Sequence, residues 1–182
     1  MFKLAIEQFS APGQHWLDAG CGTGQFAAFL GTLGHRVTAI DASSEMVRLC
    51  QVPAIVASVE QLPFPDATFD GILCSSVLEY LDSPSVALTE FRRVLKPNGC
   101  LLVSVPNSHS LVRGLQRLTY SITRHPEYMK FSRHSFTAKE FDALLSAHGF
   151  TPQQNHSFGS KLPGESSLPF GYTLRLHVAC AR

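Results

Sequence analysis

The chain has 182 residues, of which 45% are hydrophobic and 16% are charged, and 15 basic residues balance 14 acidic ones to a formal net charge of +1. This length favours one domain with a single sizeable core. The low charged fraction excludes a disordered chain or a coiled coil, and the neutral balance excludes a uniformly basic surface for binding nucleic acid, which leaves only a local basic patch open.

The cysteine content and the start of the chain bear on its compartment. Five cysteines form an odd set without a Cys-x-x-Cys pair, and most sit in apolar runs: Cys21, Cys50, Cys74, Cys100 and Cys180. This pattern indicates buried reduced thiols rather than a disulfide framework or a zinc site. The first residues lack the features of a signal peptide, and no window reaches ~18 uninterrupted apolar residues. We therefore expect a cytoplasmic protein without a membrane span.

Over the first two thirds of the chain, short β-type runs alternate with helical patterns, which indicates a parallel sheet covered by helices. The predicted strands lie at 15–19, 36–40, 54–57, 71–74 and 100–105, and the predicted helices at 25–33, 43–50 and 84–95. Ser43 or Ser44 is the expected cap of the second of these helices. The third has an apolar face formed by Val86, Leu88, Phe91, Val94 and Leu95.

The pattern changes after Pro106. Residues 108–133 hold five Lys or Arg against the single acid Glu127, and Leu111, Leu115, Leu118 and Ile122 recur on one face of a predicted helix. A further helix is predicted over 137–148, begun by a Thr-x-x-Glu capping box and ended by Gly149. Two β-like stretches then flank a loop rich in Gly, Pro and Ser at 159–171. No linker separates a second domain, so we expect one domain over 1–182.

The most informative segment is LDAGCGTG at residues 17–24, which begins in the first predicted strand and continues into the glycine-rich turn after it. Glycines at this point let the backbone approach a ligand and expose the N–H groups of a helix N-terminus. Asp41, at the end of the second strand, is placed to accept hydrogen bonds from both hydroxyls of a ribose. Together they predict a nucleoside-containing cofactor across the carboxyl ends of the strands.

Spacing alone leaves the class of cofactor open. Residues 22–27, GTGQFA, also fit a loose Gly-x-Gly-x-x-Ala dinucleotide fingerprint, which keeps a nicotinamide-dependent oxidoreductase as an alternative. Asp18 discriminates between the two classes, because a carboxylate here opposes a pyrophosphate and suits a ligand that carries an amino group and a sulfonium.

Four features in order complete the pattern: LDAGCGTG, the acid at the end of the second strand, SVEQLPFPDATFDGILCSSVLEYL and FRRVLKPNGCLLVSVPN. Together they resemble a class I S-adenosylmethionine-dependent methyltransferase, of the small-molecule group that includes the ubiquinone and menaquinone methyltransferases. The resemblance runs from about Trp16 to Asn107 and continues in FTAKEFDALLSAHGF. It implies a Rossmann-like α/β fold with a seven-stranded, mostly parallel sheet, an antiparallel last strand and helices on both faces. It also implies S-adenosylmethionine as the cofactor and S-adenosylhomocysteine as its product.

The resemblance further implies which residues bind the cofactor, with Asp18 near the methionine amino group and Asp41 on the ribose. The full set is Asp18, Gly20, Cys21, Gly22 and Gly24 in the first loop, Ala42 and Met46 with Asp41 beside the adenosine, Ser58, Val59 and Glu60 at the adenine, and Cys74 and Ser75 beneath the cofactor. Each has a structural alternative: turn glycines, a helix cap at Asp41, core packing for Met46 and Val59, and a packed thiol at Cys74. No metal is implied, because the acids form no cation cluster and the eight histidines are scattered.

A bound sulfonium makes the methyl group electrophilic already, so the protein must align a nucleophile and exclude water. A general base is needed only for a hydroxyl or a protonated amine, and the candidates are Tyr80, His109 and His134. For each of the three, a structural or surface role is the alternative. We expect methyl transfer to an O, N or C atom of a small molecule.

Residues 108–135 are the expected substrate-side insertion or lid, because few residues precede the first strand to close the pocket. For the stretch 111–124, the alternatives are an ordinary packed helix and a helix that rests on a membrane surface. Methylation of RNA or protein is a second hypothesis for the function, but CSSV at 74–77 lacks the Asn/Asp-Pro-Pro-Tyr/Phe motif that clamps an amino group. The third is a cofactor-binding subunit without activity, in a dimer or beside an active partner.

Overall fold

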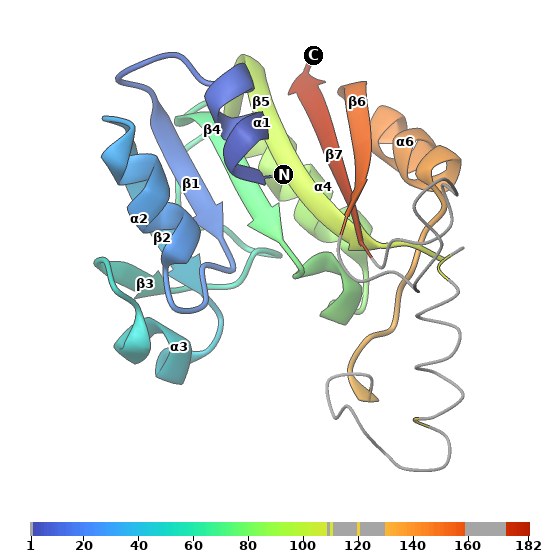
Figure 1. The fold of residues 1–182 in the computed structure, drawn as a ribbon, viewed down its shortest axis with the longest axis horizontal. Helices are drawn as coiled ribbons and strands as arrows, with labels where there is room; N and C mark the ends of the chain where they lie inside the picture. Colours follow the sequence, from blue (N-terminus) through green and yellow to red (C-terminus); the bar gives the residue numbers. More distant parts are fainter. Residues whose placement is uncertain (1, 109, 111–119, 121–129, 159–173) are drawn as a thin grey trace.

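A computed structural model of the protein describes residues 2–108, 110, 120, 130–158 and 174–182 (Figure 1). In this part of the chain, seven strands form one sheet in the order β3-β2-β1-β4-β5-β7-β6. The strands are β1 (His15–Ala19), β2 (Arg36–Asp41), β3 (Ala54–Val56), β4 (Phe69–Ser75), β5 (Leu95–Pro106), β6 (Phe150–Phe158) and β7 (Leu174–Ala181). The helices are α1 (Phe2–Phe9), α2 (Gln25–Thr32), α3 (Ser44–Leu49), α4 (Pro84–Val94), α6 (Ala138–Ala147) and the short 3-10 helix η1 (Leu78–Tyr80).

The strand pairing confirms the predicted mostly parallel sheet. Strands β1 to β5 pair in parallel, whereas β7 lies antiparallel between β5 and β6. From β1 the chain first runs outward to β2 and β3, and then returns to the other side of β1 as β4. Such a reversal of strand order leaves a crevice at the carboxyl ends of β1 and β4, which is where ligands bind in sheets of this type.

Two apolar cores lie on the two faces of the sheet, as helices on both faces require. One contains Ile6 of α1, Leu30 of α2 and Trp16 of β1. The other contains Phe91 of α4 and Phe141 of α6. Because side chains alternate along a strand, Trp16 enters the first core and its neighbour Leu17 the second. Fully burying a side chain of this size contributes roughly 1.5–3 kcal/mol, which fixes the orientation of each strand.

The local signals for helix ends are confirmed, and one apolar face is corrected. The Ser43 hydroxyl accepts a hydrogen bond from the Met46 N–H, and Thr137 forms its capping box with Glu140. In α4 the predicted apolar residue Val86 is 44% exposed, and Ala87 is buried in its place. Residues 84, 87/88, 91 and 94 repeat at three or four positions, so 86 falls outside the buried stripe.

The sequence pattern does not predict α1, and the predicted strands at 71–74 and 100–105 are shorter than the observed β4 and β5. Helix α1 buries Ala5 and Ile6 on the same face of the sheet as α2. Strand β4 begins two residues before the predicted start, at Phe69, which pairs with Leu95 at the start of β5. Most of the predicted insertion, including His109, the stretch 111–119 and residues 121–129, lies outside the described residues, as does the predicted loop 159–171.

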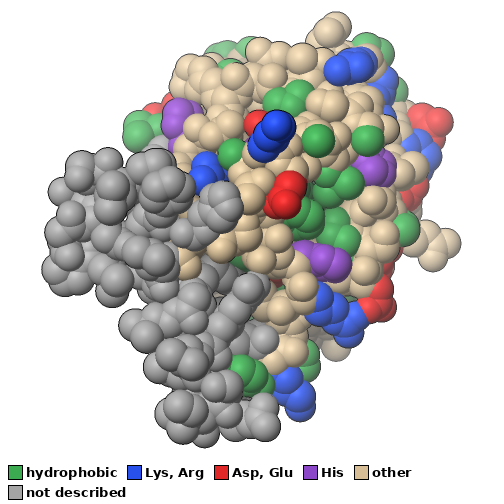
Figure 2. All heavy atoms as spheres, turned by 90° about the vertical axis from the view of Figure 1, so that its right-hand side faces the viewer, with side chains coloured by type: hydrophobic (Ala, Val, Ile, Leu, Met, Phe, Trp, Pro, Cys, Tyr) green, Lys and Arg blue, Asp and Glu red, His purple; other side chains and the backbone are tan. Residues whose placement is uncertain are grey.

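The surface over α6 and β6 carries no field of one sign. Figure 2 shows acidic, basic and histidine side chains interspersed among apolar ones on the part of this face that is drawn in colour. This agrees with the neutral composition. Among the described helices, none combines the length and the apolar character needed to cross a membrane.

Candidate active site

A cleft of about 650 Å³ opens at the carboxyl ends of β1, β2 and β4, at the crevice that the strand order creates. Its size is typical of a small-molecule site. Most of its wall is apolar, and the lining residues are Gly20, Gly22, Asp41, Ala42, Met46, Ala57, Ser58, Val59, Ser75, Ser76, Val77, Tyr80 and Leu81. Eight of these thirteen are predicted cofactor-binding residues: Gly20, Gly22, Asp41, Ala42, Met46, Ser58, Val59 and Ser75. A ninth lining residue, Tyr80, is one of the three candidate bases.

The glycine-rich loop follows a path that only glycine adopts without strain. Gly20, Gly22 and Gly24 have φ angles of 79°, 52° and 79°. The N–H groups of Gly20 and Cys21 donate to the carbonyl of Ile40 at 2.9 and 2.8 Å, which ties the loop to the end of β2. A Cβ on Gly20 would lie 2.2 Å from a methyl carbon of Val77. The loop is therefore packed directly against Val77, which also lines the cleft.

Asp41 joins the loop to the beginning of α3. One carboxylate oxygen accepts the Gly22 N–H at 2.9 Å, and the other accepts the Ser43 N–H at 2.8 Å. The side chain is only partly buried and lines the cleft. Since each carboxylate oxygen has two lone pairs, both retain capacity to accept a ligand hydroxyl. The structural role and the ligand role predicted for Asp41 are thus compatible.

Asp18 lies at the end of β1, directly before the loop, and is 2% exposed. Burial, with a smaller contribution from Asp41, raises the pKa of Asp18 to about 7, although the Ala27 N–H opposes the shift. Its Oδ2 atom has no hydrogen-bond partner among the described residues. A buried carboxylate oxygen without a donor is destabilising, so this atom can accept a hydrogen bond from a cationic or N–H group of a ligand.

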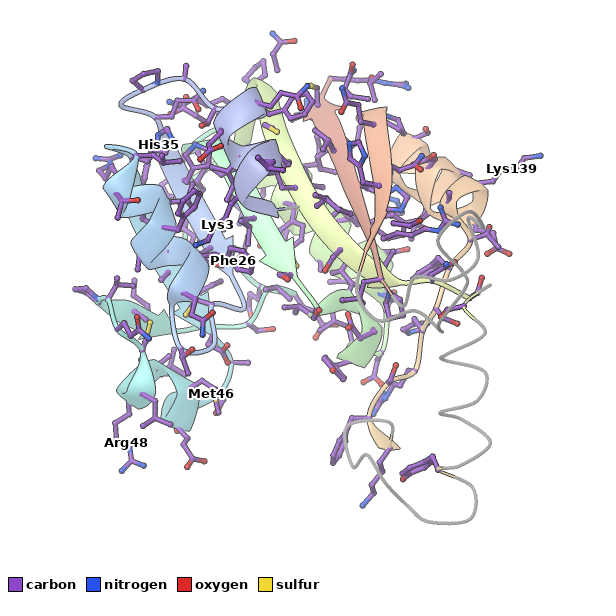
Figure 3. All side chains as sticks on the ribbon, in the orientation of Figure 1. Lys3, Phe26, His35, Met46, Arg48 and Lys139 are labelled. Carbon is purple, nitrogen blue, oxygen red and sulfur yellow. The ribbon has the colours of Figure 1, made fainter. Side chains whose placement is uncertain are left out.

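The far wall is formed by α3 and the segment after β3. Figure 3 shows the side chains of Met46 and Arg48 on different sides of α3, and Met46 is the one that lines the cleft. Val59 is 6% exposed and also lines it, so it serves both the core and the site. Glu60 is outside the lining of the described cleft, and its N–H donates to the Ser58 hydroxyl at 3.1 Å.

Four predicted cofactor-binding residues besides Glu60 lie behind the lining of the described cleft: Asp18, Cys21, Gly24 and Cys74. Cys74 is fully buried, and this burial raises the pKa of its thiol well above the ordinary value. The Cys21 thiol lies 3.9 Å from the thiol of Cys50. A Cβ on Gly24 would lie 2.5 Å from that same Cys50 sulfur. Cys21 and Gly24 thus pack the loop against Cys50.

Of the three candidate bases, Tyr80 is the one that the structure places in the cleft, on η1 and 39% exposed. The Nε2 atom of His134 lies 3.0 Å from the Leu81 carbonyl, and its ring stacks on Phe136. The N–H groups of Arg133 and His134 donate to the Glu79 carbonyl at 2.7 and 3.3 Å. His134 therefore holds η1 in place, outside the lining of the described cleft, and His109 lies outside the described residues.

Four lining residues were not predicted from the sequence: Ala57, Ser76, Val77 and Leu81. Ser76 has a φ angle of 55°, and its N–H donates to the Ser104 hydroxyl of β5 at 3.0 Å. The positive φ angle of Ser76 cannot be recognised from the neighbouring sequence, because it is held by the hydrogen bond to Ser104 on β5. The one usable signal is position, since all four follow the ends of β3 and β4.

Comparison with known proteins gives consistent results. Residues 17–103 match the methyltransferase domain family. The chain is 35% identical over 184 aligned residues to the ubiquinone/menaquinone biosynthesis C-methyltransferase UbiE of Rubrivivax gelatinosus, an alignment that covers 87% of this chain and 73% of that protein. It is 41% identical over 112 residues to the uncharacterised methyltransferase YodH of Bacillus subtilis, with 56% of this chain and 48% of YodH covered. The chain thus spans about half the length of some of these relatives.

A solved structure has the same fold. The 1,6-didemethyltoxoflavin N1-methyltransferase of Burkholderia thailandensis, determined with 1,6-didemethyltoxoflavin and S-adenosylhomocysteine bound, superposes with a TM-score of 0.70. The match covers 98% of this chain and 76% of that one at 22% sequence identity. The superposition establishes the shared architecture. At this low sequence identity, the methyl acceptor of the two proteins need not be the same.

Proposed function

Because the chain belongs to the class I S-adenosylmethionine-dependent methyltransferases, we propose that it transfers a methyl group from this cofactor to an O, N or C atom of a small-molecule acceptor. The observation that carries the proposal is the orphaned Oδ2 of Asp18, buried directly before a glycine-rich loop that lines a cleft. A pyrophosphate group would meet a buried carboxylate there, whereas an α-amino group would complete its hydrogen bonds. This favours S-adenosylmethionine over a nicotinamide dinucleotide.

The described residues fit this cofactor along its length. Asp18 would accept from the amino group, and Asp41 would accept from the ribose hydroxyls while it keeps the Gly22 N–H. Met46 and Val59 would contact the adenine from the far wall. When bound, the cofactor supplies a methyl group made electrophilic by the adjacent sulfonium.

The protein's own contribution is alignment and exclusion of water. Val77, Tyr80 and Leu81 form a mostly apolar part of the cleft wall, and Val77 packs against Gly20 of the glycine-rich loop. Holding an acceptor in line against such a wall can lower a barrier by roughly 7–11 kcal/mol in favourable cases. The Tyr80 hydroxyl is our candidate to orient the acceptor or take its proton, and His134 acts as a positioning residue through its bond to the Leu81 carbonyl. His109 stays a candidate base.

A small organic acceptor is supported by the cleft and by the relatives. The lining is mostly apolar, and no described cluster of basic residues borders it. UbiE is named as a C-methyltransferase of ubiquinone and menaquinone biosynthesis, and the Burkholderia enzyme was determined with 1,6-didemethyltoxoflavin bound. These names support a small molecule as the acceptor and do not decide between C, N and O. The free thiols keep the cytoplasm as our expected location.

Calorimetry with the purified protein tests the cofactor. We expect S-adenosylhomocysteine to bind and to raise the thermal unfolding temperature, with no shift from NAD. A shift with NAD and none with S-adenosylhomocysteine would overturn the proposal. Incubation with labelled S-adenosylmethionine and a metabolite extract then tests activity. Binding without any labelled product would favour a cofactor-binding subunit that needs a partner.

A further inference from the structure

Two cysteine thiols meet beside the cofactor loop. Cys21 lies between Gly20 and Gly22, which both line the cleft, and Cys50 directly follows α3. Their sulfur atoms are 3.9 Å apart, and both residues are free thiols that are only partly buried. A small oxidant in solvent therefore has access to them.

Backbone contacts hold the two cysteines beside each other. The Gln51 N–H donates to the Thr23 carbonyl at 3.0 Å, which fastens the residue after Cys50 to the loop. The Cys50 sulfur lies so close to Gly24 that a Cβ there would approach it to 2.5 Å. A disulfide has a sulfur–sulfur distance of about 2.05 Å, so closure requires the thiols to approach by roughly 2 Å.

We propose that Cys21 and Cys50 form an oxidative modification site, at which a hydroperoxide converts the two thiols into a disulfide that reshapes the glycine-rich loop and lowers its affinity for cofactor. The part that concerns cofactor rests on the proposed function. Disulfide formation itself does not, because it depends on the two thiols alone.

The chemistry needs one hydroperoxide for each pair of thiols. One of the two sulfur atoms attacks the peroxide, the O–O bond breaks, and the leaving alkoxide or hydroxide takes up the proton of that thiol. The other thiol then attacks the resulting sulfenic acid, which forms the S–S bond between Cys21 and Cys50 and releases water. Burial, the neighbouring Cys50 and the carboxylates of Asp18 and Asp41 raise the pKa of Cys21 to about 12, so little thiolate forms at Cys21 at neutral pH and the reaction should become faster as pH rises.

The disulfide would act on the cofactor site through the loop backbone. The Gly22 N–H, next to Cys21, donates to Asp41 at 2.9 Å. Moving the Cys21 sulfur toward Cys50 displaces this N–H and the edge of the cleft at Gly20. By linkage, bound cofactor must oppose disulfide formation by the same factor by which the disulfide weakens cofactor binding.

The test uses the intact protein, reduced or treated with hydrogen peroxide. Peptide mass spectrometry after alkylation is expected to show a Cys21–Cys50 link, with two hydrogen atoms lost from the intact mass. Calorimetry is expected to show that the oxidised protein binds S-adenosylhomocysteine at least about 10-fold more weakly than the reduced protein does. A thiol reductant restores the affinity, and prior addition of S-adenosylhomocysteine slows formation of the link.

Matched variants separate this pair from the other cysteines. Cys50→Ser, or Cys50→Ala if serine disturbs folding, is expected to bind S-adenosylhomocysteine as tightly as the reduced parent protein does. Treatment with peroxide should leave the affinity of this variant unchanged. Cys180→Ser serves as the control, because Cys180 faces Cys100 across β5 and β7, away from the cleft, and this variant should respond like the parent protein.

Three outcomes overturn the proposal: no Cys21–Cys50 link after peroxide, a link with unchanged affinity, or a Cys50→Ser protein that still loses affinity. If the reduced protein binds no S-adenosylhomocysteine, the proposed function fails together with the coupling to cofactor. The mass measurement still decides disulfide formation in that case.

Discussion

Replacing Asp18 by Asn is expected to stabilise the unliganded protein and, at the same time, to weaken cofactor binding. The pKa of Asp18 is raised from 3.8 to about 7 by burial, and the residue is 2% exposed. Between these two values the folded protein holds a proton that the unfolded chain has released. The free energy of unfolding must therefore fall as pH rises through this window.

The size of the effect follows from the shift. About three units of pKa correspond to at most about 4 kcal/mol, an upper bound because the folded state relaxes around the charge. The stability advantage of the Asp18→Asn protein over the parent should grow as pH rises from about 4 and be complete above about pH 7, and the two proteins should match only well below the unfolded pKa of 3.8, where Asp18 is protonated in both states. Denaturant titrations at several pH values measure this, with the buried Trp16 as the fluorescent probe.

Asp70→Asn is the matched control, with the opposite sign. Although burial alone raises it, the His15 N–H and the Lys96 ammonium hold the pKa of Asp70 below its ordinary value. Asp70 therefore contributes stability at neutral pH that is lost on acidification, and Asp70→Asn should destabilise the protein at neutral pH. An Asp18→Asn protein that is equally destabilised there would refute the account of Asp18 as an uncompensated buried acid.

Cofactor binding adds a second measurement. Below pH 7, Asp18 must release its proton to pair with a cationic amino group, so the affinity for S-adenosylhomocysteine should rise up to about tenfold per pH unit and level off above pH 7. Calorimetry in buffers of different ionisation enthalpy should detect the released proton. Affinity that is independent of pH in the parent protein, or unchanged in Asp18→Asn, would contradict the assignment.

Two further predictions concern the walls of the cleft. Asp41→Ala should weaken S-adenosylhomocysteine binding roughly 10- to 100-fold, because a charged hydrogen-bond acceptor is lost, while the exposed neighbour Glu45→Ala should leave calorimetric affinity unchanged. Gly20→Ala should lower the unfolding temperature more than Gly22→Ala, because its Cβ would meet Val77 at 2.2 Å, whereas no described atom lies within 4 Å of a Cβ on Gly22. Adding Val77→Ala to Gly20→Ala should recover part of the loss, and equal unfolding temperatures for the two glycine variants would contradict this.

Features with local causes could be predicted from the sequence. Ser43 and Thr137 cap their helices through hydrogen bonds that span three residues, so the sequence contains both partners. The glycine-rich loop and Asp41 were expected at one edge of the sheet, because the carboxyl ends of parallel strands share that edge. The antiparallel β7 was expected from the family resemblance, and the pairing confirms it.

Features set by distant contacts could not be predicted. Helix α1 has eight residues, too few to be stable alone, and it forms because Ile6 is buried against the sheet. Ser76 takes its positive φ from a bond to Ser104, 28 residues away in the chain. The Cys21 and Cys50 thiols meet across 29 residues, and a list of five cysteines gives no sign of this contact.

The position of β7 has a consequence for how the chain folds during synthesis. Strand β6 precedes β7 in sequence but pairs only with β7, and β7 lies between β6 and β5. Until residues 174–181 leave the ribosome, β5 has an open edge beside Val103 and Val105, and β6 has no strand to join. Nascent chains should therefore be prone to aggregation until residues 174–181 have been synthesised, and truncations before 174 should depend on chaperones.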